Sequence, residues 1–410
     1  MRKVFEVELD GHNGVYTKLT LPATPCAMLD ALEKLWLAEG EAPGWEILQS
    51  DAFPGVSMYL DQKGTLSELN ALAQRLAALD EQELAIVEGL AIMEREQSEK
   101  SRIPLPRLID LASSTNCCHL VEGVVTDAQL GRFCAENGFV PEADDLSDAA
   151  FALLDFARIG KQFRQAEGGV FTRVGYVQRH DELKQVYQTL DITIKKPDYA
   201  ILAGLPDGSR VELPTPLGKT VVEEPAQCVD CTAPALNGLT AMRSTLDMLA
   251  RRLAELEVDG ELTKYKAVLA ATGCENIAQA LVLADELDQY IFDPDLLEPD
   301  EVAGVKLDQL LGDDMVKLLL PHVQLCAFGS ALIQASGGKL TAYGLVERTD
   351  SQPVQGMDQE QRQAGEWILS DAQWKGLYQR GRRISEWTRA QIMMCGQRYH
   401  SSWTSTAAGS

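Results

Sequence analysis

Two stretches of this chain recur further along it, in the same order and at nearly the same spacing. LNALAQRLAAL (Leu69 to Leu79) matches LDMLARRLAEL (Leu246 to Leu256) at seven of eleven positions, so that Leu69 corresponds to Leu246. GGVFTRVGYVQR (Gly168 to Arg179) matches GGKLTAYGLVER (Gly337 to Arg348) at six of twelve, so that Gly168 corresponds to Gly337. Each copy of a repeat must be one packing unit. Because this period far exceeds that of a solenoid, we expect two whole copies in tandem, which suits a length of 410 residues.

The chain is strongly acidic, with 61 acidic against 37 basic residues and a formal net charge of -24. Hydrophobic residues make up 45% of it, so ordinary cores can still be buried. Nucleic-acid binding is driven by Lys and Arg that neutralise phosphates. Direct binding of nucleic acid by the acidic body is therefore disfavoured. The densest acidic stretch runs from Asp285 to Glu301, with eight carboxylates and no Lys or Arg, and a smaller group runs from Glu142 to Asp148.

The segment from Thr349 to Ser410 differs from the rest. It holds seven basic and six acidic residues and four of the six Trp. We interpret it as a tail outside the repeat, with a helix expected around Ser385 to Met394. A surface-docking or partly disordered terminus is favoured, and contact with nucleic acid or a membrane surface is the alternative.

The beginning of the chain gives an expectation about location. MRKVFEVELD alternates like a strand and lacks the apolar run of a signal peptide. No stretch approaches the roughly 20 apolar residues that span a bilayer. We expect a cytoplasmic protein without membrane partners, in which the nine cysteines are reduced thiols.

The first copy predicts strands followed by helices. Strands are expected at Phe5 to Leu9 and Tyr16 to Leu21, and a helix from Ala27 to Trp36. Thr65 and Glu68 have the spacing of a capping box at the start of the next helix. Further helices are expected at 83–96, 105–112, 126–137 and 147–165, and then a glycine turn and a strand at 170–177.

The second copy repeats this order with shorter pieces. Strands are expected near 199–202 and at 210–213, helices at 244–256, 262–271 and 277–287, and a closing helix and strand up to Arg348. A linker between the copies is expected around Gln178 to Pro197.

The first copy resembles the ArdA antirestriction proteins of conjugative plasmids and transposons. The resemblance is carried by Leu21-Pro22 after the leading strands, by TLSELNALAQRLAAL from Thr65, and above all by LLDFARIGKQFRQAEGGVFTRVGYV from Leu153. It covers the first copy well and the second copy more weakly, and it does not cover the tail. The family's motif of an aromatic residue, a glycine four residues later, a helix end and a closing strand is matched by Phe156, Gly160, Gly168 and Gly169. The second copy echoes it with Gly329, Gln334, Gly337 and Gly338.

The resemblance implies an α+β fold class and an elongated multi-domain chain. Two ArdA-like copies would each contain an α/β unit, a helical bundle and a closing α/β unit. The expected boundaries are 1–62, 63–140 and 141–182 for the first copy, 183–238, 239–302 and 303–349 for the second, and 350–410 for the tail.

The resemblance also implies a function. ArdA proteins pair through their last domain into a curved dimer that imitates bent B-form DNA and occupies the DNA groove of type I restriction-modification enzymes, at the methyltransferase core. A duplicated chain could act as a pseudo-dimer by itself or as a homodimer.

Elementary physics makes such mimicry plausible. Duplex DNA carries one negative charge per ~1.7 Å of axis, and carboxylates at i and i+4 on a helix recur about every 6 Å. Complementary fields raise association rates and reject other partners. The candidate DNA-mimic residues are Glu142, Asp144, Asp145, Asp148, Asp285, Glu286, Asp288, Asp293, Asp295, Glu298, Asp300 and Glu301. The alternative for each of them is a carboxylate that only solvates the surface.

Other sequence signals point to little chemistry. Cys228 and Cys231 have the spacing of a zinc half-site or a redox pair, but Cys274 and His322 do not form a second knuckle. Cys117 and Cys118 are more typical of buried thiols. The five histidines are scattered, and no nucleophile elbow, H-E-x-x-H or P-loop is present. We therefore expect no catalytic residue, no metal and no cofactor.

The sequence thus predicts a non-enzymatic DNA mimic from a mobile genetic element that blocks a type I restriction-modification enzyme. The alternative is an acidic regulator that binds another basic host protein, such as a different defence effector or a nucleoid factor. A carboxylate enzyme that the motifs do not reveal is a third possibility.

Overall fold

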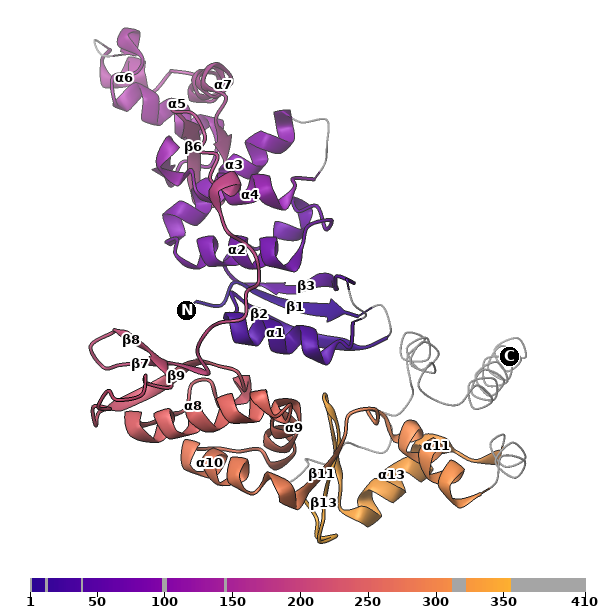
Figure 1. Cartoon of the computed structure of the whole chain (residues 1–410). Helices are drawn as coiled ribbons and strands as arrows, with labels where there is room; N and C mark the ends of the chain where they lie inside the picture. Colours follow the sequence, from indigo (N-terminus) through magenta and orange to yellow (C-terminus); the bar gives the residue numbers. More distant parts are fainter. Residues whose placement is uncertain are drawn as a thin grey trace, which may run out of the picture. The chain divides into compact units, whose positions relative to one another are not determined.

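The computed structural model describes residues 2–11, 14–37, 40–97, 102–143, 146–311 and 322–354. It contains helices and several small sheets, so the mixed α+β class is confirmed. The chain divides into two compact units (Figure 1). Unit 1 comprises the described residues within 1–9, 18–23 and 45–194, and unit 2 comprises the described residues within 10–17, 24–44 and 195–354. The seven segments expected from the sequence remain predictions, as does the helix expected around Ser385, which lies outside the described residues.

The first part of unit 1 combines a sheet and helices. Strands β1 (Phe5–Asp10), β2 (Tyr16–Leu21) and β3 (Gly44–Ser50) form a sheet in the order β2-β1-β3. Helices α2 (Leu66–Ala77), α3 (Glu81–Gln97) and α4 (Leu105–Ala112) follow. The capping box at the start of α2 is confirmed, because the Glu68 backbone N–H donates to the Thr65 hydroxyl and the Glu68 carboxylate accepts from the Thr65 backbone N–H.

Unit 1 ends in a second three-stranded sheet covered by helices. Its strands are β4 (Cys118–Glu122), β5 (Val170–Phe171) and β6 (Gly175–Arg179), in the order β4-β6-β5. Its helices are α5 (Asp127–Glu136), α6 (Asp148–Phe151) and α7 (Phe156–Glu167). We call this assembly the first closing module. Strand β4 was not predicted and lies within the segment expected to be a helical bundle.

Two predictions in this module were wrong. The single helix expected at 147–165 is two helices, because the Asp155 carboxylate caps a new helix by accepting from the Arg158 backbone N–H. The single strand expected at 170–177 is two strands. The Thr172 hydroxyl donates to the Gly175 carbonyl and accepts from the Val174 and Gly175 backbone N–H groups, which closes a turn between them.

The segment expected to link the copies is partly fastened to unit 1. The Asp110 carboxylate of α4 accepts from the backbone N–H groups of Val186 and Tyr187 at 2.7 and 2.9 Å. The Tyr187 hydroxyl donates to the Glu68 carboxylate at 2.6 Å. The Lys184 backbone N–H donates to the Ser114 hydroxyl at 3.0 Å. The chain from Lys184 to Tyr187 therefore belongs to the packed body of unit 1.

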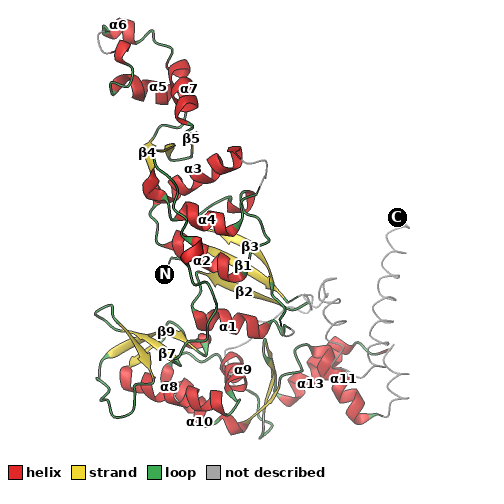
Figure 2. Ribbon diagram, turned by 45° about the horizontal axis from the view of Figure 1, so that its top comes forward, coloured by secondary structure: helices red, strands yellow, loops and turns green. Residues whose placement is uncertain are grey.

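Unit 2 is built on an antiparallel sheet in the order β10-β9-β7-β8 (Figure 2). Its strands are β7 (Ile201–Gly204), β8 (Arg210–Leu213), β9 (Pro225–Cys231) and β10 (Thr240–Met242). Helix α8 (Arg243–Val258) packs on this sheet, and α9 (Leu262–Thr272) and α10 (Ile277–Asp285) pack against α8. Helix α1 (Pro25–Lys34) also belongs to unit 2.

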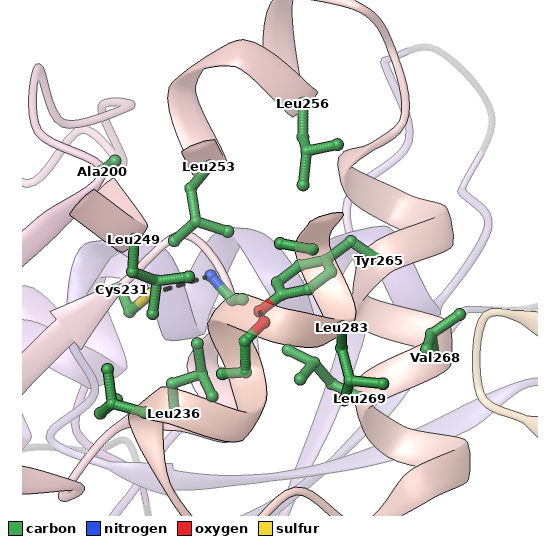
Figure 3. Close-up of a cluster of buried hydrophobic side chains, with 14 of the residues drawn as sticks. Ala200, Cys231, Leu236, Leu249, Leu253, Leu256, Tyr265, Val268, Leu269 and Leu283 are labelled. Atoms are coloured by element: carbon green, nitrogen blue, oxygen red, sulfur yellow. Dashed lines mark hydrogen bonds between the residues drawn. The ribbon is translucent and has the colours of Figure 1, made fainter. Parts of the chain in front are cut away.

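The core of unit 2 lies between the sheet and these helices (Figure 3). Leu249 and Leu253 of α8 face Tyr265 and Leu269 of α9, and all four side chains are buried. The Tyr265 hydroxyl reaches a partner inside this apolar cluster by donating to the Ala280 carbonyl at 2.8 Å. The i, i+4 leucines of α8, which occur in one of the repeated segments, thus form the core face of that helix.

A second closing module ends unit 2. Strands β11 (Tyr290–Asp293), β12 (Lys339–Thr341) and β13 (Gly344–Arg348) pair in the order β11-β13-β12. Helices α11 (Pro299–Leu310) and α13 (Leu325–Ser336) pack against each other. Helix α9 packs on this sheet, as α3 packs on the sheet of the first closing module.

The two closing modules share details beyond strand order. The paired residues Val170 and Val177 correspond in the repeat to the paired residues Lys339 and Val346. The Thr341 hydroxyl donates to the Gly344 carbonyl at 2.8 Å, as the Thr172 hydroxyl does to the Gly175 carbonyl at 2.9 Å. Similar sequence therefore forms the same turn twice.

Among the described residues, no helix is long and apolar enough to cross a membrane.

Candidate acidic interaction surface

The structure sorts the twelve candidate carboxylates by exposure. Asp144 and Asp145 lie outside the described residues. The exposed candidates are Glu142, Asp148, Asp285, Glu286, Asp288 and Asp295. Asp293 and Glu298 are partly buried, and Asp300 and Glu301 are buried, with 8% and 5% of their surface accessible. The structure thus leaves six described carboxylates well placed to meet a partner.

The two buried carboxylates lie in the first turn of α11. One Glu301 carboxylate oxygen accepts from the backbone N–H groups of Leu297 and Glu298 at 2.7 and 3.0 Å. Together with Glu298, it forms the capping box of α11. Since burial withdraws Asp300 and Glu301 from solvent, we leave them out of the candidate surface.

Three of the exposed candidates in unit 2 gather at the end of α10. Asp285 is the last residue of α10, Glu286 follows it, and Asp288 lies in the 3-10 helix η6 (Leu287–Gln289). Arg252 of the neighbouring helix α8 adds Glu255, because its guanidinium lies 3.4 Å from the Asp285 carboxylate and 3.1 Å from that of Glu255. We call Glu255, Asp285, Glu286 and Asp288 the acidic face.

The acidic face keeps an excess of negative charge. Two of the four carboxylates, Glu255 and Asp285, share the Arg252 guanidinium, which also donates to the Ala284 carbonyl. Among the described residues, no cation lies within ion-pair distance of Glu286 or Asp288. The side chains of Asp285 and Glu255 are 67% and 62% exposed, so the charge is accessible to a partner.

The position of this charge on its helix is unfavourable. The C-terminal end of a helix carries a partial negative charge, so a carboxylate there costs about 0.3–1 kcal/mol. Asp285 and Glu286 stand at that end of α10, where a Lys or Arg would be stabilising. The helix dipole therefore disfavours both carboxylates, and among the described residues only Asp285 has a compensating cation, Arg252.

Sequence reasoning did not include Glu255 in this surface. It lies well before Asp285 in the chain and outside the dense acidic stretch, and only the packing of α8 against α10 brings the two together. The i, i+3 spacing of Arg252 and Glu255 was the available signal.

The glycines of the family motif have structural roles. A Cβ on Gly160 of α7 would lie 1.8 Å from the Asp127 carbonyl oxygen of α5. A Cβ on Gly329 of α13 would lie 1.6 Å from the Pro299 carbonyl oxygen of α11. Each glycine lets two helices cross at backbone contact, and each helix partner is contacted at its first residue. The same device thus occurs in both closing modules.

The other motif residues end helices and support this crossing. Gly168 and Gly337 end α7 and α13 in the left-handed conformation, at φ of 67° and 70°. A Cβ on Gly169 would clash with the Tyr176 hydroxyl at 2.2 Å, and one on Gly338 would meet the Glu347 Cγ at 2.9 Å. The Phe156 ring lies 5.5 Å from the Arg132 guanidinium.

The cysteines of the C-x-x-C pair are buried. Burial raises the pKa of the Cys231 thiol well above its usual range, which favours the protonated thiol. The Cys228 thiol lies 3.7 Å from the Asn237 amide oxygen. Within the ranges that the structure describes, no group of three or more His, Cys, Asp or Glu side chains is arranged to hold a metal ion.

Neither protein-family models nor curated protein sequences yielded a match to this chain.

Proposed function

We propose that this protein is a non-enzymatic DNA mimic of a mobile genetic element that occupies the DNA groove of a type I restriction-modification enzyme. The observation that carries the proposal is the acidic face, four accessible carboxylates near the C-terminal ends of α8 and α10, of which only Glu255 and Asp285 pair with a cation, Arg252, among the described residues. Such enzymes grip DNA with Lys and Arg. Carboxylates held rigidly in a row would present these Lys and Arg side chains with negative charge in place of the DNA phosphates.

The chain is proposed to be two ArdA-like copies in tandem. The shared strand order of the closing modules, their shared threonine turns and their shared glycine crossings support a duplication. Under this proposal, each copy contributes one segment of the mimic surface. The exposed Glu142 and Asp148 belong to the segment from the first copy.

Charge density explains why no single carboxylate should be essential. Interactions between exposed charges are worth roughly 0–1 kcal/mol each, so affinity comes from many of them together. An enzyme would instead lose its activity when one catalytic group is replaced. Neutralising the cluster therefore distinguishes a mimic from an enzyme.

The test measures binding of the full chain to a purified type I methyltransferase core, with duplex DNA as competitor. Binding that duplex DNA displaces is the expected result. In the test variant Glu255→Gln, Glu286→Gln and Asp288→Asn are combined, and we expect affinity to fall by at least about tenfold at low salt.

The matched control carries Asp198→Asn, Glu212→Gln and Glu223→Gln, three exposed carboxylates elsewhere in unit 2. It changes the net charge by the same amount and should retain affinity. Equal weakening by both variants would point to net charge instead of a defined surface. Binding that duplex DNA does not displace would favour the alternative, an acidic regulator of another basic host protein.

A further inference from the structure

Helix α1 is embedded in unit 2, although the strands on either side of it in sequence lie mainly in unit 1. Cys26, Met28, Asp30 and Ala31 are its buried residues. It contacts β9 and the 3-10 helix η5 (Pro234–Leu236). A helix from the beginning of the chain is thus part of the body formed by its second half.

A buried carboxylate holds the N-terminal end of α1. Asp230 of β9 has no accessible surface, and one of its oxygens accepts from the Cys26 backbone N–H at 3.3 Å. The same oxygen accepts from the Tyr199 hydroxyl at 2.9 Å, and the other accepts from the Cys231 backbone N–H at 3.0 Å. A negative charge there complements the partial positive charge of a helix N-terminus.

A second set of buried groups holds the middle of α1. Lys266 of α9 lies 3.2 Å from the Asp30 carboxylate and 2.6 Å from that of Glu33. The Tyr343 hydroxyl donates to Asp30 at 2.7 Å. Lys266 and Asp30 are both nearly inaccessible to solvent. We call these four side chains the α1 lock.

The packing around the α1 lock is incomplete. Cavities of about 300 and 340 Å³ lie beside it, and Lys266 lines both. Dense apolar packing alone therefore does not hold α1. A buried charge that lacks its ion-pair partner is costly. The site in unit 2 that holds α1 is therefore selective for a helix that carries both Asp30 and Glu33.

The second half of the chain has no helix of its own at the position that corresponds to α1. In the first half, α1 lies between β2 and β3. The segment at 214–224, between β8 and β9, forms no helix. The comparison of the two halves rests on the proposed duplication, whereas the seating of α1 does not.

We propose that α1 is the helix that completes the second copy, and that Asp230 and the α1 lock form its specific seat. Unit 2 then depends on a segment from the first copy, and the two copies cannot act as independent inhibitors. Since α9 carries Lys266 and packs against α10, a seated α1 also supports the helix that ends in the acidic face.

The test is hydrogen exchange of the full chain, followed by mass spectrometry of peptides that cover α1. In the variant Lys266→Met, both carboxylates of α1 lose their cation on α9, and Asp30 keeps only Lys34 of its own helix, at 2.7 Å. We expect the amides from Met28 to Lys34 to exchange at least about tenfold faster, while peptides of α5 and α7 in unit 1 are unchanged. Unchanged protection of α1 would overturn the proposal.

The matched control is Lys264→Met, which alters a lysine of the same helix that pairs only loosely with Glu261 at 3.9 Å. It should leave the exchange of α1 unchanged. If Lys266→Met does not fold, Tyr343→Phe removes a single hydrogen bond from the lock and should still speed exchange in α1 a few-fold. Combining it with Asp30→Ala should add little to Asp30→Ala alone, because both remove the same bond. Full additivity would count against the lock.

Failure of this proposal can be distinguished from failure of the proposed function. If α1 is seated but the restriction enzyme is not bound, the function fails and the seat stands. If the enzyme is bound and α1 exchanges as fast in the wild type as in Lys266→Met, the seat fails and the function stands.

Discussion

A Cβ on Gly160 would stand 1.8 Å from the carbonyl oxygen of Asp127, so α7 and α5 cross at backbone contact. Gly160→Ala must push the helices apart, and we expect it to lower the free energy of unfolding by about 1–3 kcal/mol. Gly329→Ala, against the Pro299 carbonyl, should do the same in the second closing module. Denaturant unfolding monitored by circular dichroism measures both.

Gly304 in α11 provides the control, because a Cβ there meets no atom of the described residues within 4 Å. Gly304→Ala should be neutral or should stabilise by up to about 1 kcal/mol, since alanine loses less backbone entropy in a helix. If all three variants lost stability equally, close crossing would not be the reason for the motif glycines.

Asp127 and Arg164 form a two-bond ion pair between α5 and α7, at 2.8 and 3.2 Å. The hydrogen bonds from Arg164 lower the pKa of the Asp127 carboxyl in the folded state. The contribution to stability is therefore present above the unfolded pKa of about 3.9 and is lost as pH falls through the lower folded pKa. Asp127→Asn should cost about 1 kcal/mol at pH 7. The difference from wild type in urea unfolding should shrink below about pH 4, and a constant difference would exclude the ion pair as its cause.

The local sequence determines some elements and leaves others open. The predicted bounds of β2, β8 and α4 agree with the structure because alternation or an apolar stripe runs the length of each. Strands β3, β4, β9, β10 and β11 were missed. Strands β4 and β11 are short, and each pairs with a strand that comes much later in the chain, β6 for β4 and β13 for β11, so its conformation depends on a distant partner.

The same limit applies to the candidate surface. Charge density singled out Asp285 and Asp300 alike, but only Asp285 is exposed, because the packing around the first turn of α11 buries Asp300. The interruption between α6 and α7 was missed because the helical spacing of apolar residues continues through Leu153 and Leu154. The only sequence signal for it was Asp155, which caps α7.

Glu301 is acidic and close in sequence to the acidic face, yet its role is to cap α11. Glu301→Ala removes the acceptor for the Leu297 and Glu298 backbone N–H groups, and we expect a loss of about 1–2 kcal/mol. Because Glu301 is buried, affinity for the restriction enzyme should stay within about twofold in a direct binding assay at a temperature where the variant is folded. A large loss of affinity without a loss of stability would return Glu301 to the candidate surface.

Glu286 and Asp288 should show the opposite behaviour, a gain in stability with a loss of binding. Both are exposed near the C-terminal end of α10, where their charge opposes the helix dipole and repels Asp285. Glu286→Gln combined with Asp288→Asn should raise the free energy of unfolding by about 0.5–1 kcal/mol at low salt, with the gain reduced in about 1 M NaCl by screening. Asp285 is left in place because Arg252 is its partner. Thermal unfolding and enzyme inhibition are measured on the same preparation. If the double variant is less stable than wild type, the acids at this helix end are structural, and the helix dipole does not disfavour them.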